Sequence, residues 1–215
     1  MDRRKALRNM GLSLGYVVAI PTLLSLAQSC KQDATLAWTP DFLSSEEGNV
    51  LTTLVDIILP KTDTPSASEV QAHLFIDRFA NEIMEKEKKE LFKMSMGKFM
   101  NKALLDSGKK NIGDLKAEDL EPVLANALKT PKEDQAKHFK LISKYTEAIR
   151  TGEAATLSDE VSRFAFADNL RGLTIWSYKT SEYIGENVLA YLPVPGEYIG
   201  CGDLQELTGG KAWSI

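Results

Sequence analysis

Few residues of this chain combine the types and spacing that catalysis or cofactor binding requires. Its two histidines, His73 and His138, are far apart and belong to different predicted helices. The sequence contains no Cys-x-x-Cys-His motif for covalent haem and no Gly-x-Gly-x-x-Gly loop for a dinucleotide. No set of metal ligands occurs at a usable spacing. We therefore expect no catalytic residue, no cofactor-binding residue and no metal site on this chain.

A cysteine near the N-terminus is a candidate site of covalent modification. Residues 26–30 read Leu-Ala-Gln-Ser-Cys, which resembles a bacterial lipobox, so we expect lipidation of Cys30 and a membrane anchor. Two alternatives remain open. Ordinary cleavage nearby would leave Cys30 as a free thiol. An uncleaved transmembrane helix is disfavoured, because the apolar run over residues 11–27 is short and contains Pro21.

The residues before that apolar run predict export. Arg3 and Arg4 are followed by Leu7 and Arg8, which resembles a twin-arginine signal with Ala6 where the pattern prefers Phe. We therefore interpret residues 1–29 as an export signal and expect a periplasmic, membrane-anchored lipoprotein. Twin-arginine export carries folded cargo, so the protein could cross the membrane already assembled with a partner.

The net charge of the chain disfavours one class of partner, the nucleic acids. The 215 residues carry a net charge of -4, and the first 29 residues contribute +3, which leaves -7 on the remainder. An acidic exported domain is a poor nucleic-acid binder, because such binding needs a basic face. With Cys30 acylated, Cys201 is the only other cysteine, so it either pairs with another chain or remains a thiol, buried or free.

The hydrophobic spacing predicts an all-α fold. Residues 30–43 are interpreted as a tether and residues 44–215 as one domain of about six or seven helices. Ser44 and Glu47 form a capping box, and that helix must end at Leu59 because Pro60 follows. Ser66 and Glu69 predict a second helix start. Later helices are expected up to Gly108, over residues 117–128, from Thr130 to Gly152, from Ser158 past Trp176, and from Ser181 to Leu192.

Two irregular segments interrupt or follow these helices. Residues 61–67 read Lys-Thr-Asp-Thr-Pro-Ser-Ala, a composition typical of a loop. Residues 193–215 are rich in Gly and contain Pro and aromatic residues, and we expect them to form a long irregular tail. Such a tail is ordered only where a surface satisfies its backbone groups. That surface could be the helical body of this chain or a partner subunit.

The same two segments carry a family resemblance. Residues 58–67 resemble the small-subunit family of membrane-bound gluconate 2-dehydrogenase, its subunit 3. The pairing of Tyr-Lys-Thr-Ser-Glu at 178–182 with Pro-Gly-Glu-Tyr-Ile-Gly-Cys at 195–201 resembles it too. The resemblance covers roughly residues 45 to 205. Ser66 stands where the family often has Gly, and Trp176 with Ser177 where a Gly often precedes the Tyr.

The resemblance implies a non-catalytic subunit. Such subunits bind a large FAD-dependent dehydrogenase of the glucose-methanol-choline class, which oxidises a sugar or polyol such as gluconate or a glucoside, and a cytochrome c often accepts the electrons. The flavoprotein commonly lacks its own export signal and travels with the small subunit. FAD is then expected on the partner and a c-type haem on a third subunit, since the flavin chemistry belongs to the cofactor and its own protein.

We expect the irregular loop and the tail to form much of the partner interface, because both carry the resemblance. Tyr191 and Tyr198 offer the broad amphipathic surfaces that are enriched at interfaces. The full set of candidate interface residues is Pro60, Thr62, Asp63, Thr64, Pro65, Tyr178, Tyr191, Pro195, Gly196, Tyr198 and Cys201. Two other functions remain open: a stand-alone helical envelope lipoprotein that binds a ligand or an envelope component, and an independent enzyme that uses scattered carboxylates.

Overall fold

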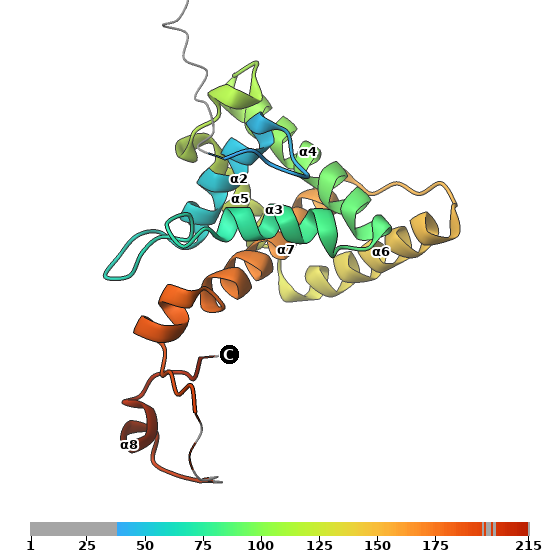
Figure 1. The fold of residues 1–215 in the computed structure, drawn as a ribbon. Coiled ribbons are helices and arrows are strands. Elements are labelled where there is room, and N and C mark those ends of the chain that lie inside the picture. Colours follow the sequence, from blue (N-terminus) through green and yellow to red (C-terminus); the bar gives the residue numbers. More distant parts are fainter. Residues whose placement is uncertain (1–37, 195, 197–198, 200, 215) are drawn as a thin grey trace, which may run out of the picture. The chain divides into compact units, whose positions relative to one another are not determined.

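A computed structural model describes residues 38–194, 196, 199 and 201–214, and these residues are mainly helical (Figure 1). The helices are α2 (Ser45–Ile58), α3 (Ala72–Glu82), α4 (Lys86–Ser107), α5 (Ala117–Leu128), α6 (Lys132–Thr151), α7 (Asp159–Lys179) and α8 (Leu204–Thr208), with a 3-10 turn η1 (Ile112–Asp114) and a π-helical turn η2 (Ile184–Val188). The prediction of an all-α fold is confirmed. The predicted export signal, with Arg3, Arg4 and Leu7, and the lipidation site Cys30 lie outside the described residues.

Local sequence signals set several helix ends as predicted. Ser44 caps α2 through a capping box: its amide donates to Glu47 Oε2 at 2.8 Å, and its hydroxyl accepts from the Glu47 amide at 3.3 Å. Ser158 caps α7 by accepting from the Val161 amide at 3.3 Å. Gly152 ends α6 with a positive φ of 80°, a conformation that costs glycine little.

Helix α7 is central to the core. It packs against α2, α3, α4, α5 and α6. Phe166 of α7 meets Phe92 and Phe99 of α4, with ring centroids 5.5 and 5.0 Å apart. Removing a buried ring of this kind typically costs roughly 3–5 kcal/mol. The core therefore holds α7 firmly, and α7 in turn fixes the position of Tyr178 near its C-terminal end.

The last part of the predicted tether is packed on the helices. Residues 38–43, here called the strap, are held by Asp77 of α3, whose side chain is 1% exposed. Its carboxylate accepts from the backbone N–H groups of Asp41 at 2.6 Å and of Leu43 at 3.0 Å. Trp38 packs edge-on against His73, with ring centroids 5.3 Å apart. The prediction that the whole of residues 30–43 is a tether is therefore wrong for the strap, because a buried carboxylate far along the chain satisfies its amides.

Two predicted helix starts are also wrong. Ser66 and Glu69 do form reciprocal capping bonds, with Ser66 N to Glu69 Oε2 at 2.8 Å. However, residues 67–71 form turns, and α3 begins only at Ala72, after Gln71 takes a left-handed φ of 62°. Thr130 does not cap α6, because its hydroxyl donates back to the Ala127 carbonyl at 2.8 Å. Helix α6 instead begins at Lys132 without a side-chain cap.

The C-terminal end of the chain departs most from the prediction. Instead of a helix from Ser181 to Leu192, a π-helical turn ends at Val188 and the chain becomes extended. The glycine at 185 explains the close return of the chain, because a Cβ there would lie 2.9 Å from Ser214 Oγ. Ala190 pairs with the returning end of the chain in an isolated bridge: its amide donates to the Ala212 carbonyl, and its own carbonyl accepts from Ser214 N, both at 2.9 Å.

The described residues of the segment 189–214, here called the arm, lead away from Ala190, and the segment returns to it at Ala212 and Ser214. Within it, Asp203 caps the short helix α8 by accepting from the Gln205 amide at 2.8 Å. The prediction of a tail without helix is wrong for these five residues. None of the described arm residues is buried. Among the described helices, none has the length and apolar character that a membrane span requires.

Candidate functional site

The loop that carries the family resemblance is held by a tyrosine from the far end of the sequence. Tyr178 Oη of α7 lies 2.9 Å from Thr64 Oγ1 and 2.8 Å from the Pro65 carbonyl oxygen. At the base of the loop, Ala67 N donates to the Leu59 carbonyl at 3.0 Å. The structure thus brings together the two segments, 60–67 and 178–182, that the sequence analysis had linked only by resemblance.

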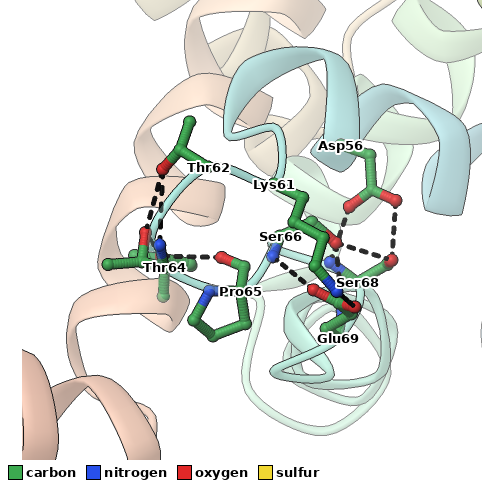
Figure 2. Close-up of polar contacts among 9 residues, drawn as sticks. Asp56, Lys61, Thr62, Thr64, Pro65, Ser66, Ser68 and Glu69 are labelled. Atoms are coloured by element: carbon green, nitrogen blue, oxygen red, sulfur yellow. Dashed lines mark hydrogen bonds and ion pairs between the residues drawn. The ribbon is translucent and has the colours of Figure 1, made fainter.

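A carboxylate of α2 fixes the segment after the loop. Asp56 accepts from the Ser68 amide at 2.8 Å and from the Ser68 hydroxyl at 2.6 Å (Figure 2). Glu69 accepts from the Ser66 amide and also pairs with Lys61, whose Nζ lies 2.6 Å from Glu69 Oε1. Hydrogen bonding from Lys61 lowers the pKa of Glu69. Both side chains of that pair are exposed to solvent, so it adds little stability.

The loop forms one wall of an open hollow of about 690 Å³, and the residues after α7 form the other. The loop contributes hydroxyls from Thr62 and Thr64 and the carboxylate of Asp63, and the second wall contributes Glu182 and Tyr183. Thr62, Asp63, Glu182 and Tyr183 are all exposed. Pairing Lys61 with Glu69 leaves the lining with the negative charges of Asp63 and Glu182. The hollow is therefore an acidic, hydroxyl-rich surface.

An apolar groove continues from the hollow, and the two share Val70, Gln71 and Ser181. It lies between α3 and α7, and three aromatic rings form its floor. Trp176 meets Phe75 and Phe79 edge-on, at centroid distances of 5.0 and 5.3 Å. Phe75 remains 37% exposed and Trp176 43% exposed. Exposed aromatic rings grouped in this way are typical of surfaces that bind another protein.

The structure separates the predicted interface residues into groups. Pro60, Thr62 and Asp63 are exposed on the loop, whereas Thr64, Pro65 and Tyr178 are half-buried and hold the loop in place. Tyr191, Gly196 and Cys201 are exposed on the arm. Pro195 and Tyr198 lie outside the described residues. Cys201 is an exposed free thiol, so the alternative of a buried thiol is wrong.

The described residues contain no group of three or more His, Cys, Asp and Glu side chains that could hold a metal ion. Both histidines are buried against aromatic rings, His73 against Trp38 and His138 against Phe164. Burial lowers the pKa of His73, and the nearby charge of Asp56 opposes this only in part. These histidines therefore pack within the body and do not line the hollow.

Sequence reasoning missed two side chains that hold this region together, Asp56 and Asp77. Each lies on a helix, where an acidic residue is usually explained by a solvated face. Their partners are 12 and 34 to 36 residues away in the sequence. No local pattern marks a carboxylate that accepts backbone amides from a distant segment, so neither residue could have been identified from spacing.

A family model described as Gluconate 2-dehydrogenase subunit 3 matches residues 45–196. The chain belongs to this family. The match runs from the start of α2 into the arm, so it includes the 61–65 loop and Tyr178. The resemblance inferred from these residues is thereby confirmed. No curated protein and no solved structure matches the chain.

The chemistry of the site does not indicate a function by itself, but the family does. The family is named as one component, subunit 3, of a multi-subunit dehydrogenase. The described surface of this chain offers an acidic hollow, an aromatic groove and an exposed arm. The Tyr178 hydroxyl holds the loop, and Asp56 holds the segment that follows it.

Proposed function

We propose that this chain is the non-catalytic small subunit of a periplasmic, FAD-dependent dehydrogenase that oxidises a sugar or polyol. The observation that carries the proposal is the match to the subunit 3 family across the whole helical body. The large subunit, of the glucose-methanol-choline class, would hold the FAD and perform the oxidation. A cytochrome c with covalent haem would accept the electrons. This chain would contribute binding surface and no reacting group.

We further propose that the chain escorts the flavoprotein during export. Arg3 and Arg4 would direct the assembled pair through the twin-arginine route, and acylation of Cys30 would then anchor the complex to a membrane. Strap residues begin at Trp38, so only seven residues separate the acylated cysteine from the folded body. A fully extended chain spans at most about 3.3–3.6 Å per residue, so the body would remain within roughly 30 Å of the anchor.

The arm and the hollow support a large contact with the partner. The arm exposes Tyr191, Leu192, Val194 and Ile199, and α8 adds Leu204 and Leu207. Apolar side chains this exposed gain little from the arm's own fold, but a partner surface that covered them would stabilise the complex by about 25 cal/mol per Å² of apolar area buried. The exposed thiol of Cys201 could also form a disulfide with the partner, within an oxidising compartment.

The test is to isolate the tagged chain from periplasmic membranes and to record the absorbance spectrum of what co-purifies. We expect one large flavoprotein, with flavin bands and, when the third subunit is retained, haem bands. The same tag on a chain with Arg3→Lys and Arg4→Lys is the control, and it should recover neither protein from the periplasm. If the wild-type chain is recovered alone and without flavin, the proposed function is wrong.

A further inference from the structure

The hydroxyl of Tyr178 joins parts of the molecule that are otherwise connected only through the core. The ring of Tyr178 packs against the buried core, so its position is set by α7. Its oxygen reaches Thr64 Oγ1 and the Pro65 carbonyl, more than a hundred residues earlier in the sequence. No other hydrogen bond to the Pro65 carbonyl occurs among the described residues.

The backbone of Tyr178 also holds the opposite wall of the hollow. Its carbonyl accepts from the Ser181 hydroxyl at 2.7 Å and from the Ser181 amide at 3.2 Å. Ser181 precedes Glu182 and Tyr183, which line the hollow. One residue therefore sets the distance between the loop wall and the Ser181–Tyr183 wall, through its hydroxyl on one side and its carbonyl on the other.

Without that hydroxyl, the tip of the loop would have only local support. The Thr62 amide donates to the Thr64 carbonyl at 3.0 Å, and the Thr64 amide donates to Thr62 Oγ1 at 3.4 Å. Both bonds join residues within the tip and neither reaches the body. Ser68 is fixed to Asp56, but it lies beyond Pro65 and does not hold the tip. The other contact of the 61–65 loop is the Lys61–Glu69 pair, which is exposed and adds little stability, so the loop opens easily.

We propose that Tyr178 is a positioning residue that holds the 61–65 loop in its docking conformation before the dehydrogenase subunit binds. This rests on the proposed function, in that the partner is the large subunit. It changes the role expected for Tyr178: the hydroxyl is directed at the loop, so Tyr178 acts through the loop and not by contacting the partner. A partner that binds only the ordered loop loses affinity in proportion to the fraction of molecules in which the loop is disordered.

The test compares Tyr178→Phe with the wild-type chain, in the full mature protein. Phenylalanine keeps the ring in the core and removes only the hydroxyl. Tyr145→Phe is the matched control, because Tyr145 of α6 is a buried tyrosine outside the hollow. Two readouts are needed: amide hydrogen exchange at Thr62, Thr64 and Ser66 in the free chain, and the dissociation constant for the purified flavoprotein.

We expect Tyr178→Phe to speed exchange at these amides and to weaken flavoprotein binding by about five- to thirtyfold, mostly through a slower association rate. Tyr145→Phe should change neither. Faster exchange with unchanged affinity would overturn the positioning role while leaving the proposed function intact, and so would unchanged exchange with unchanged affinity. Unchanged exchange with weaker binding would show that the hydroxyl contacts the partner directly, which also overturns the role. If the wild-type chain itself fails to bind the flavoprotein, the proposed function is wrong and this inference falls with it.

Discussion

Replacing Asp77 by Asn should destabilise the body far more than its conservative size suggests. The carboxylate is buried, and each oxygen has its own strong bond: Oδ2 accepts from Asp41 N at 2.6 Å and Oδ1 accepts from Leu43 N at 3.0 Å. Whichever way the amide of Asn turns, its NH₂ group faces one of these two donors. One bond is lost in either orientation: the bond to Leu43, which is buried and cannot be replaced by water, or the shorter bond to Asp41, which is half-buried.

The loss in the free energy of unfolding can be worked out from those bonds. A hydrogen bond to a charged group contributes about 1.5–3 kcal/mol, and the remaining bonds weaken when the charge is removed. We therefore expect Asp77→Asn to lower the free energy of unfolding by roughly 2–4 kcal/mol. For a body of this size that corresponds to a fall in Tm of about 5–15 °C. Thermal and urea unfolding, followed by circular dichroism, measures both quantities.

Asp63→Asn is the matched control, because the Asp63 side chain is exposed on the loop and lines only the open hollow. Limited proteolysis should in addition cut Asp77→Asn within residues 38–43, where the strap is released, and spare the control. If Asp77→Asn unfolded within about 0.5 kcal/mol of the control, the stability of the body would not depend on this carboxylate.

Four further outcomes follow from the structure and from the proposed function. Burial lowers the pKa of His73 below the ordinary histidine value of 6.5, so as the pH falls below 6.5 the unfolded chain binds the proton first and stability is lost. His73→Gln should flatten this decline in urea unfolding between about pH 7 and about pH 5.5. Truncation after Leu192 should leave the helical circular-dichroism signal nearly unchanged, because it removes only the five residues of α8 from the helices, but it should weaken flavoprotein binding. One-to-one co-purification of the truncated chain with the flavoprotein would show that the interface lies on the helices. Unfolding of the truncated chain would show that the arm is part of the fold. Arg3→Lys with Arg4→Lys should leave this chain and its flavoprotein in the cytoplasm, and a partner that still reached the periplasm at normal levels would contradict the escort role. Cys30→Ala should release the mature protein from membranes, and detection of an unmodified Cys30 in a fully soluble mature protein would reject the lipid anchor.

The sequence predicted those parts of the fold that depend on neighbouring residues. The capping box of Ser44 and Glu47, the stop before Pro60 and the cap at Ser158 are each complete within four residues, and each forms as expected. The helical body and the family could both be inferred because hydrophobic spacing and short motifs are local. The resemblance rested on the loop and on the 178–182 segment as separate motifs, and only the structure shows that the Tyr178 hydroxyl joins them.

Two predictions failed where a distant residue decides the local conformation. Ser66 and Glu69 make the bonds of a capping box, but Asp56 holds Ser68 in a turn, so α3 starts later at Ala72. The helix expected from Ser181 gives way to a π-helical turn, and the returning end of the chain pairs with Ala190. In both places the local propensity is correct but weaker than a tertiary contact.

We propose that this subunit 3 family member binds a dehydrogenase partner through the hollow, the aromatic groove and the arm. The most direct measurement is amide hydrogen exchange of the chain, free and in a purified one-to-one complex with the flavoprotein. We predict slower exchange in the complex at residues 61–67, at residues 181–188 and along the arm, with little change on α5 and on the exposed side of α6. Protection confined to α5 and α6, with the loop and arm exchanging as fast as in the free chain, would show that the partner binds elsewhere on the molecule.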